Sequence, residues 1–232
     1  MEALVEQLTE ELNCETVFTI PVFGGIPISE AVVVTWIFTA IILLLCVVLV
    51  RNLRVEHPGK KQLALECAVS KLYDFFEDTM GGMGKEYIPY LMSVAIFIGI
   101  SNLAGLFGFK PPTKDINVTA ALAVMSIILI EMAGVRRKGF GGWLKSFAQP
   151  MPVVLPINIL EIFIKPLSLC MRLFGNVLGA FVIMELLKMV VPIFVPVVFS
   201  CYFDIFDGLI QAYVFVFLTS LFIKEAMECE EA

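Results

Sequence analysis

One arginine, Arg172, lies in a long apolar stretch of this sequence. An arginine near the centre of a bilayer costs on the order of 2.5–3.5 kcal/mol, and its guanidinium stays protonated. The sequence holds no acidic residue within four positions of Arg172 on either side. Its counter-charge must therefore come from Asp204 or Asp207 in the next apolar segment, or from a carboxylate of another subunit. A fixed charge of this kind is typical of an ion path.

The polar residues around Arg172 share one face of a predicted helix. At about 100° per residue they fall within a sector of about 80°, whereas most other positions are apolar. This polar face consists of Glu161, Lys165, Ser168, Arg172, Asn176 and Gly179. Glu185 lies about 140° away from Arg172. We assign Glu185 and Lys188 to the headgroup region, as an ion pair with a spacing of three.

A second polar face follows on the last apolar segment, where Asp204, Asp207 and Gln211 lie within about 60° of one another. Two such faces opposed in a membrane predict a hydrated path rather than a lipid contact. Structural explanations stay open for two residues. Glu161 has Lys165 four positions on and fits a plain ion pair equally well, and Asn176 fits a hydrogen bond to a neighbouring helix.

The composition excludes most soluble classes of protein. Hydrophobic residues make up 59% of the 232 residues and charged residues only 16%, whereas soluble domains carry about 25% charged residues. The net charge of −6 comes mainly from the two ends, so it offers no basic footprint for nucleic acid. The six cysteines include no CxxC pair, and the single histidine, His57, has no partner ligand. We therefore expect no metal site and no cofactor.

Membrane helices must position the polar residues, and the sequence predicts an all-α polytopic membrane protein. It has about five membrane helices and an amphipathic interfacial helix, and the last two membrane helices form a long tilted hairpin. This hairpin turns near Pro192 and Pro196. The predicted segments are an extracytoplasmic part (1–30), the first span (31–50), a cytoplasmic loop with the amphipathic helix ending at Gly81-Gly82 (51–86), the second and third spans (87–134), a cytoplasmic loop (135–155), the hairpin (156–227) and a tail (228–232).

Basic residues predict the sidedness of these spans. They gather after the first span (Arg51, Arg54, Lys60, Lys61) and after the third (Arg136, Arg137, Lys138, Lys145). The positive-inside rule places both loops in the cytoplasm, which puts the acidic N-terminus outside and the C-terminus in the cytoplasm. We expect no cleavable signal peptide, because the first dozen residues are acidic and no basic region precedes a short apolar one.

Three ordered motifs resemble one family. The segment LPINILEIFIKPLSLCMRLFGN (155–176) is similar to the arginine-containing motif of subunit a of F-type ATP synthases. The segment FDGLIQAYVFVFLTSLFI (206–223) resembles the last helix of that family. Upstream, SNLAGLFGFKPPTKDINVTAALA (101–123) resembles its block of asparagine, glycine and paired prolines. The chain is therefore identified as a bacterial member of this family.

The resemblance implies a stator subunit that catalyses no reaction itself and lies in the bacterial inner membrane. Its partners would be a rotating ring of c subunits, a b-type peripheral stalk and the other synthase subunits. Two aqueous half-channels would end near Arg172, which would face the ring carboxylate. The resemblance makes Asp204 the main proton relay, Asp207 an added channel carboxylate and Gln211 the neighbour of Arg172. It also has Asn176 orient the arginine, and Glu161 or Lys165 line the inner access path.

One position departs from the family pattern. Nine residues after the arginine many members carry histidine or glutamate, whereas this chain has Phe181, which cannot titrate. Asp207 or Glu185 would then take the missing role. The coupling ion stays open between protons and sodium. A stand-alone secondary transporter is the rival class, but the sequence shows no internal repeat of the kind that many transporters have.

Overall fold

Five helices of the structure are long and apolar enough to cross a membrane. The computed structural model describes residues 16–20, 26–51, 53–54, 58–107, 111–147, 151–190 and 194–228. Within these residues the candidate spans are Glu30–Val50, Lys85–Leu106, Ile116–Ser146, Leu155–Lys188 and Val198–Met227. This confirms the predicted all-α polytopic membrane fold.

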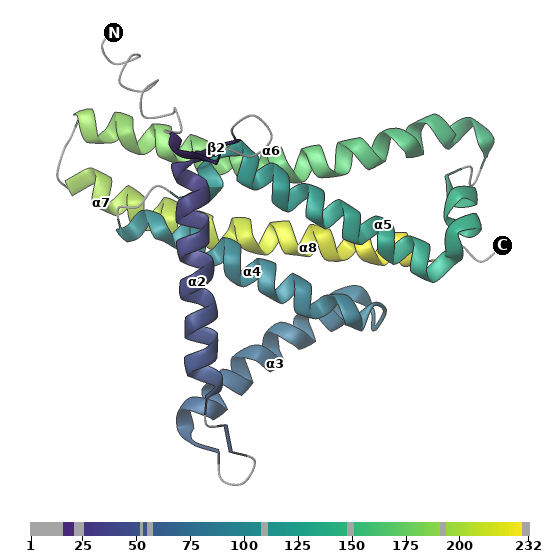
Figure 1. Cartoon of the computed structure of the whole chain (residues 1–232), viewed down its shortest axis with the longest axis horizontal. Helices are drawn as coiled ribbons and strands as arrows, with labels where there is room; N and C mark the ends of the chain where they lie inside the picture. The colour runs from purple at the N-terminus through teal and green to yellow at the C-terminus, as the bar shows by residue number, and fades with distance from the viewer. Residues whose placement is uncertain are drawn as a thin grey trace, which may run out of the picture. The chain divides into compact units, whose positions relative to one another are not determined.

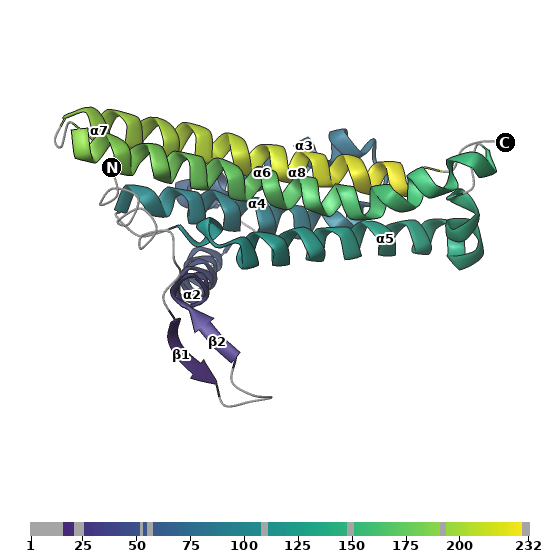
Figure 2. The same cartoon turned by 90° about the horizontal axis from the view of Figure 1, so that it is seen from above.

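The described elements follow one another along the chain as Figure 1 shows, with strands only before the first span. They are β1 (Thr16–Ile20), β2 (Ile26–Ser29), α2 (Glu30–Val50), α3 (Lys60–Met80), η1 (Lys85–Tyr87), α4 (Ile88–Leu103), η2 (Ala104–Phe107), η3 (Pro112–Lys114), α5 (Ile116–Ser146), η4 (Pro152–Val154), α6 (Leu155–Val190), α7 (Phe194–Ser200), the π-helical η5 (Cys201–Asp207) and α8 (Gly208–Met227). The sequence analysis missed the antiparallel hairpin of β1 and β2, which precedes α2 (Figure 2).

Two helices show directly how composition determines their ends and surroundings. After Glu30, α2 carries no charge and buries no side chain, which suits a helix that faces lipid. The amphipathic helix α3 buries Phe76 and Met80 and ends at Gly81. Gly81 has a φ of 63°, a left-handed conformation that glycine adopts without strain. The predicted end of α3 at Gly81-Gly82 is confirmed.

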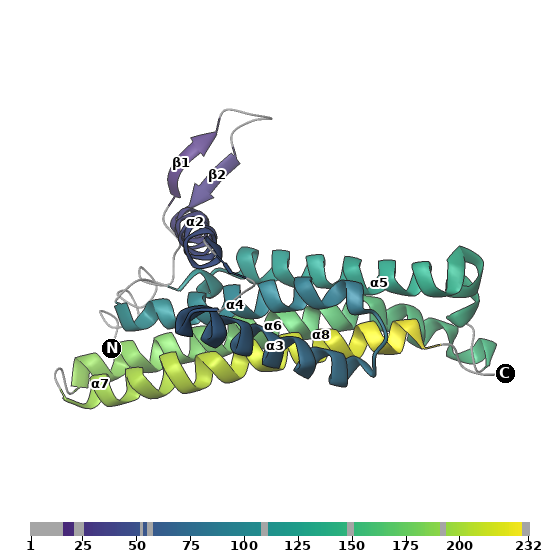
Figure 3. The ribbon, with the colours of Figure 1, turned by 90° about the horizontal axis from the view of Figure 1, so that it is seen from below.

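The chain folds as two compact units, which are described separately. The first comprises Met1–Ile42, Phe97–Thr119 and Met171–Ala212, and the second comprises Leu43–Ile96, Ala120–Cys170 and Tyr213–Ala232. Long helices contribute different portions to each unit. Figure 3 shows the course of α6 and α8. The first unit contains all the predicted ion-path residues except Glu161, which belongs to the second unit.

Buried Asn102 holds the first unit together. Its side-chain Nδ2 donates to the carbonyl oxygen of Gly208 at 2.9 Å, and its Oδ1 accepts from Thr113 Oγ1 at 2.9 Å. A Cβ atom at Gly208 would lie only 2.9 Å from the Cβ of Asn102, so this close approach requires glycine. These bonds join the end of α4, the proline-containing turn η3 and the start of α8.

The second unit contains the other portions of α6 and α8. Lys165 of α6 forms a salt bridge to Glu225 of α8 at 3.2 Å, and the ring of Phe75 in α3 lies 5.4 Å from that of Tyr213 in α8. In the first unit, Asn176 of α6 bonds to Gln211 of α8. The predicted turn at Pro192 lies outside the described residues, and Pro196 is buried within α7.

The third membrane helix is longer than the predicted span. We expected a loop from residue 135, but α5 continues through the basic residues to Ser146. Arginine and lysine are good helix formers, so the charge that marks the membrane boundary does not end the helix. The break comes at Gly139, whose φ of 72° and ψ of 161° lie outside the helical region. The helical direction changes there.

Candidate functional site

Asp204 and Asp207 both lie in η5, a π-helical turn between α7 and α8. A π-helix bonds residue i to residue i+5 and is common at functional sites. The angular spacing expected for an α-helix therefore does not hold across Cys201–Asp207. Both carboxylates are half-buried and both border the same cavity in the first unit.

This cavity has a volume of about 690 Å³ and is lined mainly by the second, fourth and fifth spans. Its size is that of a typical ligand site. The ionisable and amide side chains on its walls are Asp204, Asp207, Glu185, Lys188, Asn102, Asn176 and Gln211. A cavity with this many polar groups inside membrane helices is suited to hold water.

Asn176 connects the two polar faces that the sequence predicted. Its Nδ2 donates to Asp207 Oδ1 at 3.1 Å and to Gln211 Oε1 at 3.3 Å. Gln211 is only 4% exposed, and its Nε2 has no hydrogen-bond partner among the described residues. A buried donor without a partner costs about 1–3 kcal/mol, so the cavity must supply an acceptor. A water molecule in the cavity would satisfy this requirement.

Asp204 is held from two sides. Ser200, one turn earlier, donates its hydroxyl to Asp204 Oδ2 at 2.5 Å. On the other side, the backbone of η2 approaches at Gly105, where an added Cβ would lie 2.8 Å from the Cγ of Asp204. Such contacts are shorter than real Cβ atoms show, so a larger residue at this position would displace the carboxylate.

Glu185 forms the predicted ion pair and also reaches the cavity. Lys188 Nζ lies 2.6 Å from Glu185 Oε1. The Glu185 side chain is only 17% exposed and borders the same cavity as Asp204 and Asp207. The sequence predicts that Glu185 lies in the headgroup region, whereas in the structure it also lines the cavity. A third carboxylate is thus present where Phe181 removes a titratable group.

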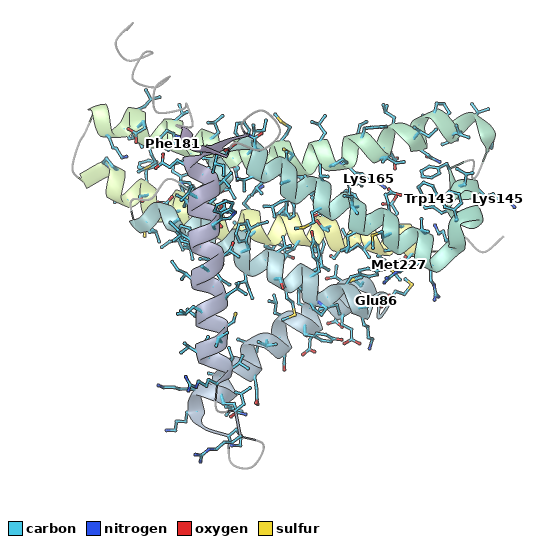
Figure 4. All side chains as sticks on the ribbon, viewed as in Figure 1. Glu86, Trp143, Lys145, Lys165, Phe181 and Met227 are labelled. Atoms are coloured by element: carbon cyan, nitrogen blue, oxygen red, sulfur yellow. The ribbon has the colours of Figure 1, made fainter. Side chains whose placement is uncertain are left out.

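Phe181 lies under a lysine that the sequence analysis did not single out. The Nζ of Lys114 lies 3.4 Å from the centroid of the Phe181 ring, and Lys114 is only 7% exposed. Such a desolvated cation–π contact contributes on the order of 2 kcal/mol. Phe181, labelled in Figure 4, also borders the cavity. Lys114 lies in the turn η3 and Phe181 lies in α6. Because the two residues are far apart in the sequence, no local sequence pattern predicts their contact.

Arg172 stays apart from this cluster. It is exposed, does not border the cavity, and forms no hydrogen bond or salt bridge with any described residue. The predicted neighbours Asn176 and Gln211 bond to each other instead. On the same helix, Cβ atoms at Gly175 and Gly179 would meet nothing within 4 Å. No residue that the structure describes pairs with Arg172, and none fills the space beside these two glycines.

Glu161 belongs to a different cluster, in the second unit. Lys165 Nζ lies 3.3 Å from Glu161 Oε2 and 3.2 Å from Glu225 Oε1. The predicted ion pair is therefore present, and it extends to α8. The Glu161 side chain is 48% exposed, so this pair contributes at most about 1 kcal/mol to stability.

The fold and the cavity define a helical membrane protein that carries ionisable groups within its spans. Comparison with known proteins assigns the family. The family model described as ATP synthase A chain matches residues 32–224, and the chain belongs to this family, subunit a of F-type ATP synthases. The chain is a multi-pass membrane subunit of the Fo sector.

Several curated bacterial relatives carry the same name. ATP synthase subunit a of Moorella thermoacetica is 37% identical over 86% of this chain and 91% of its own length. ATP synthase subunit a 2 of a Bradyrhizobium species is 35% identical over 88% of this chain and 91% of its own. The relative from Propionigenium modestum, named sodium ion specific, is 32% identical over 86% of this chain and 74% of its own.

Replacing Gly105 with alanine tests whether the position of Asp204 matters. The new Cβ must displace the Asp204 carboxylate, and a misplacement of about 1 Å can cost on the order of 100-fold in rate. We expect Gly105→Ala to lower ATP synthesis strongly in vesicles that contain normal amounts of the assembled complex. Gly99→Ala is the matched control, because its Cβ would meet only Leu209 at 4.0 Å. Equal rates for the two variants would contradict the prediction.

Proposed function

We propose that this chain is the stator subunit that carries protons past Arg172 at the interface with a rotating ring of c subunits. It would couple this flow to ATP synthesis without catalysing the reaction itself. The observation that carries the proposal is Arg172, an exposed guanidinium in a membrane helix without a partner among the described residues. An arginine in this position is costly unless another subunit supplies the counter-charge.

A carboxylate on the ring is the partner that fits Arg172. At an effective dielectric constant near 20, a positive charge about 4 Å away favours an ionised carboxylate by roughly 4 kcal/mol. That energy corresponds to about three pKa units, which is enough to make an arriving carboxylic acid release its proton. The open space beside Gly175 and Gly179 supports the approach of another helix on this side of α6.

We propose that the cavity of the first unit is the outer half-channel. Asp204 would be the main relay, because Ser200 and the backbone at Gly105 hold its carboxylate in place. Asp207 would be the next carboxylate, and Asn176 would link it to Gln211. Water bound at the free Nε2 of Gln211 would continue the path, since proton transfer needs donors and acceptors within hydrogen-bond reach.

The remaining assignments follow the charge distribution and the family. We propose that the subunit lies in the bacterial inner membrane with its N-terminus outside and its C-terminus in the cytoplasm. This topology uses the seven predicted segments, with the helix of the third span extended beyond residue 134 to Ser146. A b-type peripheral stalk would hold the subunit against the ring. Glu161 would lie at the inner access path, where its ion pair with Lys165 is exposed.

Sodium is the second candidate for the coupling ion, and one relative favours it. The Propionigenium modestum protein is named sodium ion specific. Selectivity depends chiefly on the surroundings of the ring carboxylate, which belongs to another chain. We propose protons as the coupling ion of this complex.

Removing the charge of Arg172 tests the proposed mechanism. We expect Arg172→Ala to abolish ATP synthesis driven by an imposed proton gradient, because no fixed charge then forces the ring carboxylate to release its proton. The complex should still assemble, since Arg172 bonds to no described residue of its own chain. Lys61→Ala is the control, because it removes an exposed charge from α3. A complex with this substitution should synthesise ATP normally. Normal synthesis by an assembled Arg172→Ala complex would refute the mechanism.

Paired substitutions distinguish the two channel carboxylates. We expect Asp204→Asn to slow passive proton flow through the membrane sector at least tenfold, because general acid–base transfer contributes on the order of 100-fold or more. Asp207→Asn should have a smaller effect, since the amide can still accept from Asn176. Proton flow is measured as quenching of a pH-sensitive dye in stripped membrane vesicles. The reverse order would move the main relay to Asp207.

The effect of sodium on the purified complex tests the choice of coupling ion. If protons are the coupling ion, ATP hydrolysis by the purified complex should be the same with and without added sodium at constant ionic strength. Sodium should also fail to protect the ring carboxylate from a carboxyl-modifying carbodiimide. Stimulation of hydrolysis by sodium, together with protection, would instead establish sodium coupling.

A further inference from the structure

The second unit contains a separate cavity that the ion path does not use. It has a volume of about 570 Å³, and its walls are apolar except for Glu131 and Arg136. Ile128 and Met132 of α5 line it and are both exposed. Ile162 of α6 closes one side. The cavity is therefore an open apolar groove beside a helix that spans the membrane.

A hook at the end of α5 forms one end of this groove. After the break at Gly139, the chain turns so that Trp143 Nε1 donates to Glu131 Oε2 at 2.8 Å. The indole passes close to Gly134, where an added Cβ would lie 3.3 Å from its Cδ1. The carboxylate of Glu131 is thus engaged by the indole, and the ring forms part of the groove wall. Figure 4 labels Trp143 and Lys145 on this hook.

Positive charge surrounds the hook without compensation. Arg136, Arg137, Lys138 and Lys145 lie within ten residues of one another, and Glu131 is the only acidic residue described between Ile116 and Phe147. None of the four cations forms a salt bridge or hydrogen bond with any residue that the structure describes. Arg136 borders the groove itself. The groove therefore joins an apolar wall to an unpaired cationic rim.

We propose that this groove binds an anionic phospholipid. One acyl chain would lie along Ile128, Met132 and Ile162, and the phosphate would contact Arg136 and its neighbouring cations. Basic pockets beside membrane helices bind such headgroups, and tryptophan prefers the depth at which headgroup and acyl chain meet. A soluble anion would not use the apolar wall. A lipid without net charge would leave the cationic rim uncompensated.

The site makes this chain a receptor for one class of lipid, independently of ion transport. Its residues are not those of the proposed half-channel, and its binding does not depend on the state of Arg172. The break at Gly139 gives the site its shape, because a straight helix would carry Trp143 away from Glu131.

Lipids with brominated acyl chains test the proposal, because bromine quenches tryptophan fluorescence only at close range. The purified complex is placed in phosphatidylcholine vesicles with a rising fraction of brominated phosphatidylglycerol. Subtracting the signal of the Trp143→Phe complex isolates the contribution of Trp143. We expect saturable quenching at a low fraction of phosphatidylglycerol. Brominated phosphatidylcholine in its place should give only weak quenching that rises in proportion to its fraction.

Two double variants test whether the cations beside the groove are responsible for the binding. Each basic residue near a membrane surface contributes a factor of about five in binding. Arg136→Gln with Arg137→Gln should therefore raise the half-quenching fraction about 25-fold. Lys60→Gln with Lys61→Gln removes the same charge from exposed positions of α3 and should leave the fraction unchanged. Any one of three results would overturn the proposal. They are equal quenching by both lipids, an unchanged half-quenching fraction in the arginine variant, and no quenching of Trp143.

Discussion

The hydrocarbon of a bilayer offers no water to a polar group, and this constraint governs the arrangement of the first unit. Asn102 satisfies the carbonyl of Gly208 and the hydroxyl of Thr113, and in doing so positions the start of α8. On α6, the Nδ2 of Asn176 donates to Asp207 Oδ1 and to Gln211 Oε1. The Nε2 of Gln211 has no partner among the described residues, and Gln211 borders a cavity of about 690 Å³. The described protein groups therefore leave this buried donor without an acceptor, and a water molecule in the cavity would provide one.

Two cations of the first unit meet the same constraint in different ways. Lys114 is buried, and the chain itself stabilises its ammonium with the ring of Phe181. Arg172 is exposed and has no stabilising group among the described residues. A cation that its own chain stabilises has no need of a partner, whereas an unpartnered one favours a complex in which another subunit contributes an acid. The difference between the two explains why we assign the ring interface to Arg172 and not to Lys114.

The sequence predicts features that depend on local spacing, and misses those that depend on contacts between distant segments. The five spans, the end of α3 at Gly81 and the ion pair of Glu185 with Lys188 follow from composition and helical periodicity. The contact of Lys114 with Phe181 joins residues 67 positions apart, and no pattern along the chain encodes it. The π-helical turn at Cys201–Asp207 is equally hidden, because it changes the register of hydrogen bonds without changing the apolar composition.

Glycine sets how closely the polar groups of the first unit approach one another. At Gly105 the missing Cβ leaves room for the carboxylate of Asp204, and at Gly208 it leaves room for Asn102. Gly175 and Gly179 differ, because their missing side chains leave space that no described residue fills. The first pair therefore shapes the cavity from within, while the second pair supports close contact with a partner. The sequence does not separate these two pairs of glycines, and only the surrounding atoms distinguish their roles.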